Sequence, residues 1–497
     1  MVIEVVSKSR GMEELITPAF RWIEIIMVND ISGTLANFSS KLQFDDLPED
    51  VVHETKRIIL DVMGCALGSL DLEKGRIAVE FAQKIGGRAE ASILGTIKKV
   101  SCPHAAFANG ELMHSSDYCP ILPPLEVSSF VLPASLALAE VRGSSGKAFI
   151  TATATGCEIA SRIGLSLGSH RAKSGGAPLS SWGLGCNTFG AAVAAAKIMG
   201  LETDAMSDAL GLAGYFAPVP SHQKFTFSSH AGSQKYGPAG WTAQAGVTAA
   251  LLAEMGERGD RQVLDGDYGF WAMNGSQACN WELMTRNLGT DWNIRQVKYK
   301  RFPCCGVYQS PLGAFTQLVS ENDLKPEEIE DVLVKSDALH EMVTEINDHI
   351  DAQNSLFYNI AVAAYGIPIS TSWQTRSVME NPDIRQFMKK VRFEPYAKAA
   401  EASYQELVVD RKAYINRRPS YVEVTARGKV FTQEAEYAQW LSIETPGFRA
   451  TDDDLAKKFK LNAASLLKSA KLETTIDMIL NLEEVTDINT LITSLIH

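Results

Sequence analysis

Two lysines in this sequence stand next to residues that fix the backbone. Lys235 lies in a loop bounded by Gly237 and Pro238, just before an apolar helical pattern, and Lys300 lies shortly before Pro303. Proline pushes the chain that precedes it toward extended geometry, so both lysines are expected on loops beside rigid elements. An ammonium group held in this way can bind a carboxylate through charge-assisted hydrogen bonds. We therefore expect a site for a small anionic molecule.

A carboxylate that could act as a general base lies earlier in the chain. Asp117 follows a predicted helix over 110–116 and stands beside Tyr118. A side chain in this place can take a proton from a bound substrate. An ordinary turn aspartate at a helix end is the alternative, and composition alone does not separate the two.

The fixed order of five segments resembles the MmgE/PrpD family. The segments are Asn109–Asp117, Ser233–Gly246, Lys300–Cys305, Ala352–Leu356 and Lys457–Phe459, and the likeness runs from about Ile31 to the C-terminus. The resemblance implies a dehydratase, decarboxylase or epimerase that acts on a di- or tricarboxylate. It implies active-site roles for Asp117, Lys235 and Lys300, and substrate contacts from Gly240 and Trp241 in the turn after the first lysine.

The sequence departs from the family where acid–base chemistry is expected. In an ungapped comparison the family's two central histidines fall on Glu126 and on Ser181, which stands beside Trp182, and a tyrosine of the second domain falls on His340. We therefore expect Glu126, Ser181 and Trp182 to contact the substrate. The missing imidazoles mean that the family's chemistry cannot be transferred unchanged.

Three histidines could replace the missing groups. His222 and His230 lie in the segment 218–235, and His340 lies in the second half of the chain. Imidazole is the side chain best suited to proton transfer near neutral pH. Our hypothesis is that His222 or His230, together with His340, takes over the acid–base role. A polar surface loop with incidental histidines is the alternative.

Composition and charge exclude several classes of function. The chain has 497 residues, of which 45% are hydrophobic and 21% charged, with a formal net charge of −12. These values are typical of a globular protein of about two domains, and the negative charge argues against nucleic-acid or anionic-membrane partners. Eight cysteines without CxxC spacing indicate a reduced, cytoplasmic compartment. Neither a ligand cluster nor a Gly-rich phosphate loop is evident, so we expect no metal and no cofactor.

The hydrophobic pattern predicts a mainly α protein. Helical spacing extends to about Asn293 and returns after Trp440, whereas Val332–Val334 and the alternating stretches on either side of Arg427–Lys429 predict a strand and a β-hairpin. We predict a large all-α helical domain over 31–295 and 440–497. A smaller α+β lid domain over 296–439 is inserted in it, and 1–30 form an N-terminal extension without a secretory pattern.

The leading hypothesis is a cofactor-independent lyase, a dehydratase or decarboxylase, that abstracts a proton beside a carboxylate. Two alternatives stay open. Glu126 in place of an imidazole favours an epimerase or isomerase of a dicarboxylate, and the loss of both histidines favours a catalytically degenerate member that only binds carboxylates. The resemblance also implies a homodimer, and we expect the site in the cleft between the two domains.

Overall fold

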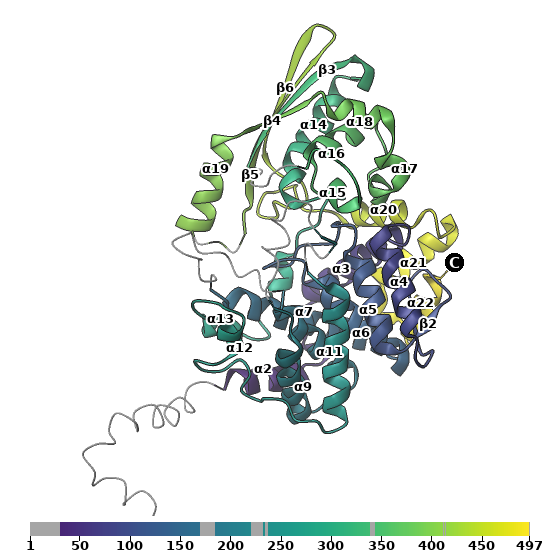
Figure 1. The fold of residues 1–497 in the computed structure, drawn as a ribbon. Coiled ribbons are helices and arrows are strands. Elements are labelled where there is room, and N and C mark those ends of the chain that lie inside the picture. The colour runs from purple at the N-terminus through teal and green to yellow at the C-terminus, as the bar shows by residue number, and fades with distance from the viewer. Residues whose placement is uncertain are drawn as a thin grey trace, which may run out of the picture.

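The computed structural model describes residues 30–168, 184–219, 232–233, 237–337, 343–410, 412 and 414–496. Figure 1 shows two groups of elements: helices alone make up most of the lower group, and the upper group combines helices with a sheet. The described part is therefore mainly helical, as predicted. None of its helices is long and apolar enough to cross a membrane.

Among the described residues, the lower group consists of helices apart from two short strands. The helix predicted over 110–116 overlaps α5, which begins eight residues earlier, at Cys102, and ends at His114. The helices are α2 (Ile31–Lys41), α3 (Glu49–Gly68), α4 (Glu73–Ile85), α5 (Cys102–His114), α6 (Ser128–Arg142), α7 (Gly146–Ser166), α8 (Cys186–Ile198), α9 (Thr203–Phe216), α11 (Ala239–Glu254), α12 (Phe270–Met273), α13 (Trp281–Thr285), α20 (Asp452–Ala463), α21 (Ser469–Leu480) and α22 (Ile488–Ser494).

Helices α7 and α8 approach each other so closely that their contact requires glycine. A Cβ atom built on Gly156 would lie 2.5 Å from the carbonyl oxygen of Gly190. Next to this contact, the alanines of α8 from Ala191 to Ala196 are fully buried. Small residues thus let these helices pack backbone to backbone.

The upper group is built on a mixed sheet of four strands in the order β4-β3-β5-β6. Strand β3 pairs parallel to β4 and antiparallel to β5, which in turn forms a hairpin with β6. The strands are β3 (Ile329–Ser336), β4 (Val391–Pro395), β5 (Arg417–Ala426) and β6 (Lys429–Tyr437), and the helices are α14 (Gln309–Glu321), α15 (His349–Gln353), α16 (Leu356–Ala364), α17 (Arg376–Met379), α18 (Pro382–Met388) and α19 (Ala397–Tyr404).

The predicted hairpin is confirmed. Its turn places Arg427 and Gly428 at φ values of 55° and 65°. Two successive residues with positive φ give the turn whose twist matches that of paired strands. Glycine at the second position makes this conformation accessible.

Two features of the sheets differ from the prediction. Strands β1 (Ala91–Ser92) and β2 (Lys99–Val100) pair within the part predicted to be all-α, and β4 was not predicted. Two-residue strands are too short to show an alternating pattern. Their position depends instead on a distant side chain, because the Glu140 carboxylate accepts hydrogen bonds from the Ser92 amide and hydroxyl, both at 2.6 Å.

The buried apolar residues form two large clusters. The first runs through the helical group and includes residues from Ile31 to Tyr299 and from Ala450 to Leu495, and the second includes residues from Phe302 to Ala426. Along the chain the change from one cluster to the other falls at Lys300 and Arg301. The boundaries at residues 295/296 and 439/440, and the role of the insert as a lid, stay predictions.

Candidate functional site

The ammonium group of Lys300 lies between two carboxylates. Its Nζ atom forms ion pairs with Asp117 Oδ1 and with Glu126 Oε1, the second at 3.2 Å, and it donates to the Asp117 carbonyl oxygen at 3.1 Å. At most 4% of each side chain is exposed. Burial alone would lower the pKa of Lys300, but the charges of Asp117 and Glu126 outweigh it and raise this pKa well above its usual value. Lys300 is therefore a fixed positive charge at neutral pH.

Asp117 is held in an unusual backbone conformation. Helix α5 ends at His114, and Asp117 has a φ of 50°, in the left-handed region. Aspartate enters this region more readily than most residues, and residues held there concentrate at functional sites. The turn brings the Asp117 carboxylate against Lys300, which is 183 positions away in the sequence.

Two buried glutamines hold this turn from the upper group of elements. Gln353, the last residue of α15, donates to the Ser115 carbonyl oxygen at 2.7 Å. Gln374, in a short helix over Thr371–Gln374, donates to the carbonyl oxygens of Ser116 at 2.6 Å and Pro303 at 2.7 Å. The cluster of Asp117, Glu126 and Lys300 thus lies where the two groups of elements meet.

One oxygen of each carboxylate has no hydrogen bond within the described part of the chain. Asp117 Oδ2 and Glu126 Oε2 are buried and have no hydrogen-bond partner among the described residues. A buried polar atom without a partner costs free energy, so its retention calls for an explanation. These two oxygens are the atoms of the cluster that could accept a proton or contact a bound molecule.

Gly240 and Trp241 lie in the first turn of helix α11 and take no part in the ion pairs of Lys300. The Gly240 amide donates to Glu111 Oε1 at 2.8 Å, and Glu111 pairs with Lys74 at 2.9 Å. The side of α11 that carries Trp241 faces solvent, since 47% of this residue is exposed. In the described part of the chain no hydrogen bond or ion pair joins Gly240 or Trp241 to Lys300.

The remaining predicted site residues lie outside the described residues: Ser181, Trp182, His222, His230, Lys235 and His340. The described residues that follow two of these segments are informative. Leu184 and Ala239 pack with Phe130, and Leu125 packs against the same small cluster. Leu125 directly precedes Glu126 in the sequence.

Most of the chain matches the two domains of one known family. The MmgE/PrpD N-terminal domain matches residues 33–280, and the MmgE/PrpD C-terminal domain matches residues 302–484. The chain belongs to the MmgE/PrpD family. Lys300 lies in the short stretch between the two matched regions.

The most similar curated proteins include cis-aconitate decarboxylases. The human enzyme is 26% identical over an alignment of 499 positions, which covers 95% of this chain and 95% of the relative. The Aspergillus terreus enzyme is 28% identical over 306 residues, which cover 58% of this chain and 60% of the relative. A cis-aconitate decarboxylase-like protein of Aspergillus oryzae is 24% identical over 496 residues, 93% of this chain and 96% of the relative. These relatives support a lyase-type enzyme.

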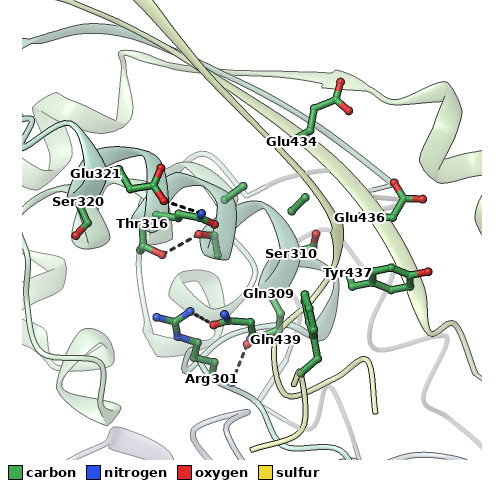
Figure 2. A pocket seen from close by; sticks show the side chains of 15 residues that line it. Arg301, Gln309, Ser310, Thr316, Ser320, Glu321, Glu434, Glu436, Tyr437 and Gln439 are labelled. Carbon is green, nitrogen blue, oxygen red and sulfur yellow. Dashed lines mark hydrogen bonds between the residues drawn. The ribbon is translucent and has the colours of Figure 1, made fainter. Parts of the chain in front are cut away.

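Two pockets of this MmgE/PrpD protein lie away from the cluster. Figure 2 shows the first, of about 540 Å³, with Ser320 and Glu321 on α14, Glu434 and Glu436 on β6, and Arg301 beside Gln439. The second, of about 600 Å³, lies between residues 344–347 and α18. Neither is lined by Asp117, Glu126 or Lys300. Binding in these pockets would therefore not reach the paired charges directly.

The sequence did not predict four buried residues that hold the backbone near the cluster. They are Gln353 and Gln374, Lys458, which donates to the Tyr118 and Lys300 carbonyl oxygens, and its ion-pair partner Asp61. Two of them stand in segments that carried the family resemblance, although no role followed from it. For Lys458 a signal was present: Leu455, Lys458, Phe459 and Asn462 are all buried and recur at helical spacing. A lysine on the buried face of an amphipathic helix is unusual enough to mark as a candidate.

Proposed function

We propose that this protein is a cofactor-independent lyase, of the decarboxylase or dehydratase type, that acts on a small di- or tricarboxylate. The observation that carries the proposal is the buried Lys300 ammonium between Asp117 and Glu126, each with one carboxylate oxygen that has no hydrogen-bond partner among the described residues. Cis-aconitate is the first substrate to test, since it is the compound in the names of the relatives. We assign substrate and charge binding to Lys300 and proton transfer to Asp117.

Both reaction types need the same charges. In dehydration a base removes the proton beside a carboxylate, negative charge develops on the substrate, and the hydroxyl group leaves as water after a general acid has donated a proton to it. In decarboxylation a C–C bond breaks, CO₂ leaves, and the electron pair left behind is delocalised and then protonated on carbon. A preorganised ammonium group stabilises the developing charge in either case. In dehydration Asp117 Oδ2 would take the proton from carbon. In decarboxylation no proton is taken from carbon, and a carboxyl group that has received a proton from solvent would donate it to the carbon that carries the electron pair.

The charge of the cluster implies a further cation. Two carboxylates and one ammonium leave one net negative charge, which would repel an anionic substrate in a buried site. Lys235, the other lysine predicted from the sequence, is our candidate for the missing positive charge.

The test is an NMR-monitored panel of di- and tricarboxylates in deuterated water. We expect cis-aconitate or a related acid to be consumed by the wild type, and turnover to fall about 10²- to 10⁴-fold in Asp117→Asn, because the asparagine cannot accept the proton. Asp208→Asn is the matched control, since Asp208 is also buried but pairs with Arg261 at 2.8 Å in another part of the molecule. Wild-type turnover in Asp117→Asn would refute the assignment.

The same experiment separates the alternatives. An epimerase or isomerase, which the presence of a second carboxylate at Glu126 favours, would introduce deuterium while the substrate keeps all its carbon atoms. A degenerate member would bind a carboxylate in titration calorimetry without any exchange. A lyase releases CO₂ or water.

We expect turnover to survive treatment with EDTA. Lys300 supplies the positive charge that a metal ion provides in other lyases, so chelation should leave the rate unchanged. Within the described ranges no group of three or more His, Cys, Asp or Glu side chains could hold a metal ion. Turnover lost with EDTA and restored by one particular metal would contradict this prediction. The homodimer and the cytoplasmic location also remain predictions.

A further inference from the structure

A second buried lysine lies behind the pair formed by Asp117 and Lys300. The Nζ atom of Lys458 in α20 donates to the Tyr118 carbonyl oxygen at 2.7 Å and to the Lys300 carbonyl oxygen at 3.2 Å. Only 2% of its side chain is exposed. One ammonium group thus binds the backbone of both segments that supply the candidate acid–base pair.

Tyr118 reinforces this connection. Its ring centroid lies 3.7 Å from Lys458 Nζ, and its hydroxyl donates to the Arg301 carbonyl oxygen at 2.9 Å. The carbonyl groups of two consecutive residues, Lys300 and Arg301, are therefore held by a lysine and a tyrosine that also contact each other. This arrangement fixes the Lys300 segment relative to the turn that contains Asp117.

Lys458 pairs with a buried carboxylate, and the close packing of α20 against α3 fixes its position. Its Nζ atom pairs with Asp61 Oδ1 in α3 at 2.8 Å, and Asp61 is fully buried. One turn further along α3, a Cβ atom on Gly64 would lie 3.1 Å from the Cα atom of Phe459, so the two helices are in close contact. The position of the ammonium group is set by helix packing and not by a flexible side chain alone.

We propose that Lys458, neutralised by Asp61, is a positioning residue that sets the geometry between the Asp117 carboxylate and the Lys300 ammonium. This inference rests on the proposed function of that pair. Lys458 acts only through the backbone of Tyr118 and Lys300, so its removal should change the chemical step more than substrate affinity.

The test compares Lys458→Met with Lys56→Met. Lys56 is a matched control because it also joins α3 to the C-terminal part of the chain, through Glu483 at 2.7 Å, without touching the site segments. In Lys458→Met we expect kcat to fall about 10- to 100-fold with KM changed less than threefold. The Lys56→Met variant should keep kcat and its pH profile, even where both variants melt at a lower temperature. A folded Lys458→Met with wild-type kcat and pH profile would overturn the proposal.

Asp61→Asn provides a second variant that keeps the shape of the side chain. Removal of this buried negative charge favours ionised carboxylates nearby, so the acidic limb of the kcat profile should move to lower pH. An unchanged limb in the folded variant counts against the inference.

A readout that needs no turnover separates this inference from the proposed function. In protein labelled with ¹⁵N at lysine, the ammonium resonance of Lys300, assigned with Lys300→Arg, should shift in Lys458→Met and stay in place in Lys56→Met. If the wild type converts no carboxylate but this resonance shifts, the proposed function fails and the positioning role stands. If the wild type is active and the resonance stays in place, the positioning role fails alone.

Discussion

Replacement of Lys300 by methionine should abolish most of the turnover and destabilise the fold at the same time. Asp117 and Glu126 would lose the ammonium that both contact in a buried site, and breaking a buried ion pair from one side costs about 3–5 kcal/mol of unfolding free energy. Loss of a preorganised charge at the reacting centre should lower kcat by about 10²- to 10³-fold. Urea denaturation and steady-state kinetics measure the two effects separately.

The control for this prediction is a triple variant. Asp117→Asn and Glu126→Gln combined with Lys300→Met remove all three charges, which should restore much of the stability but none of the turnover. A lysine on an exposed loop could lose its charge without unfolding the protein. Lys300 is not such a lysine, since only 1% of its side chain is exposed. Wild-type stability of the single variant would show that the two carboxylates do not depend on Lys300.

Lys298→Met should have the opposite effect on stability. Only 3% of Lys298 is exposed, and its Nζ atom lies 3.3 Å from the centroid of the Tyr414 ring and donates to the Ile415 carbonyl oxygen at 3.4 Å. Within the described part of the chain it forms no ion pair with a carboxylate at 4.0 Å or less. Burial, helped by the positive charge of Arg418, lowers its pKa to about 7. Methionine fills similar space without a charge, so the unfolding free energy should rise by about 2–4 kcal/mol at pH 7.

The pH dependence of this gain provides a sharper test. The pKa of Lys298 is about 7 in the folded protein and near 10.5 when unfolded, so between these values the unfolded chain binds more protons. Wild-type stability should therefore rise with pH across this window, and the advantage of Lys298→Met should be largest at pH 7 and below and small near pH 10. Denaturant unfolding at pH 6.5, 8 and 9.5 measures it, with the exposed Lys84→Met as control. A gain in unfolding free energy that is the same at every pH would contradict this explanation. The Lys298→Met variant should keep its turnover.

Features encoded in neighbouring residues could be predicted from the sequence. The β5–β6 hairpin has alternating strands and a glycine at the turn position that needs positive φ, so its signal lies within about twenty residues. Strand β4 could not be found in this way, because Val391–Pro395 is short and its parallel partner β3 lies far away in the sequence. Only the tertiary fold defines that pairing.

In the candidate site, too, some features could be predicted from the sequence and others depend on the tertiary fold. Asp117 and Lys300 were named from the family segments, and Glu126 from the ungapped comparison in which a family histidine falls on it. The structure brings these three together across 174 and 183 positions. Local sequence contains no information about which carboxylate oxygen remains free or which amide holds a given turn. Gln374 illustrates this, because its two carbonyl partners belong to residues that are 258 and 71 positions away.

The contact between Lys458 and Tyr118 spans 340 positions of the chain. During synthesis the helices that precede Lys300 leave the ribosome first and can begin to pack, but the lysine that joins the two site segments emerges only long after both of them. A nascent chain stalled before α20 would therefore hold Asp117 and Lys300 without the contact that aligns them. Chains that terminate before α20 should therefore turn over substrate poorly even where they remain compact, so full activity requires translation beyond α20.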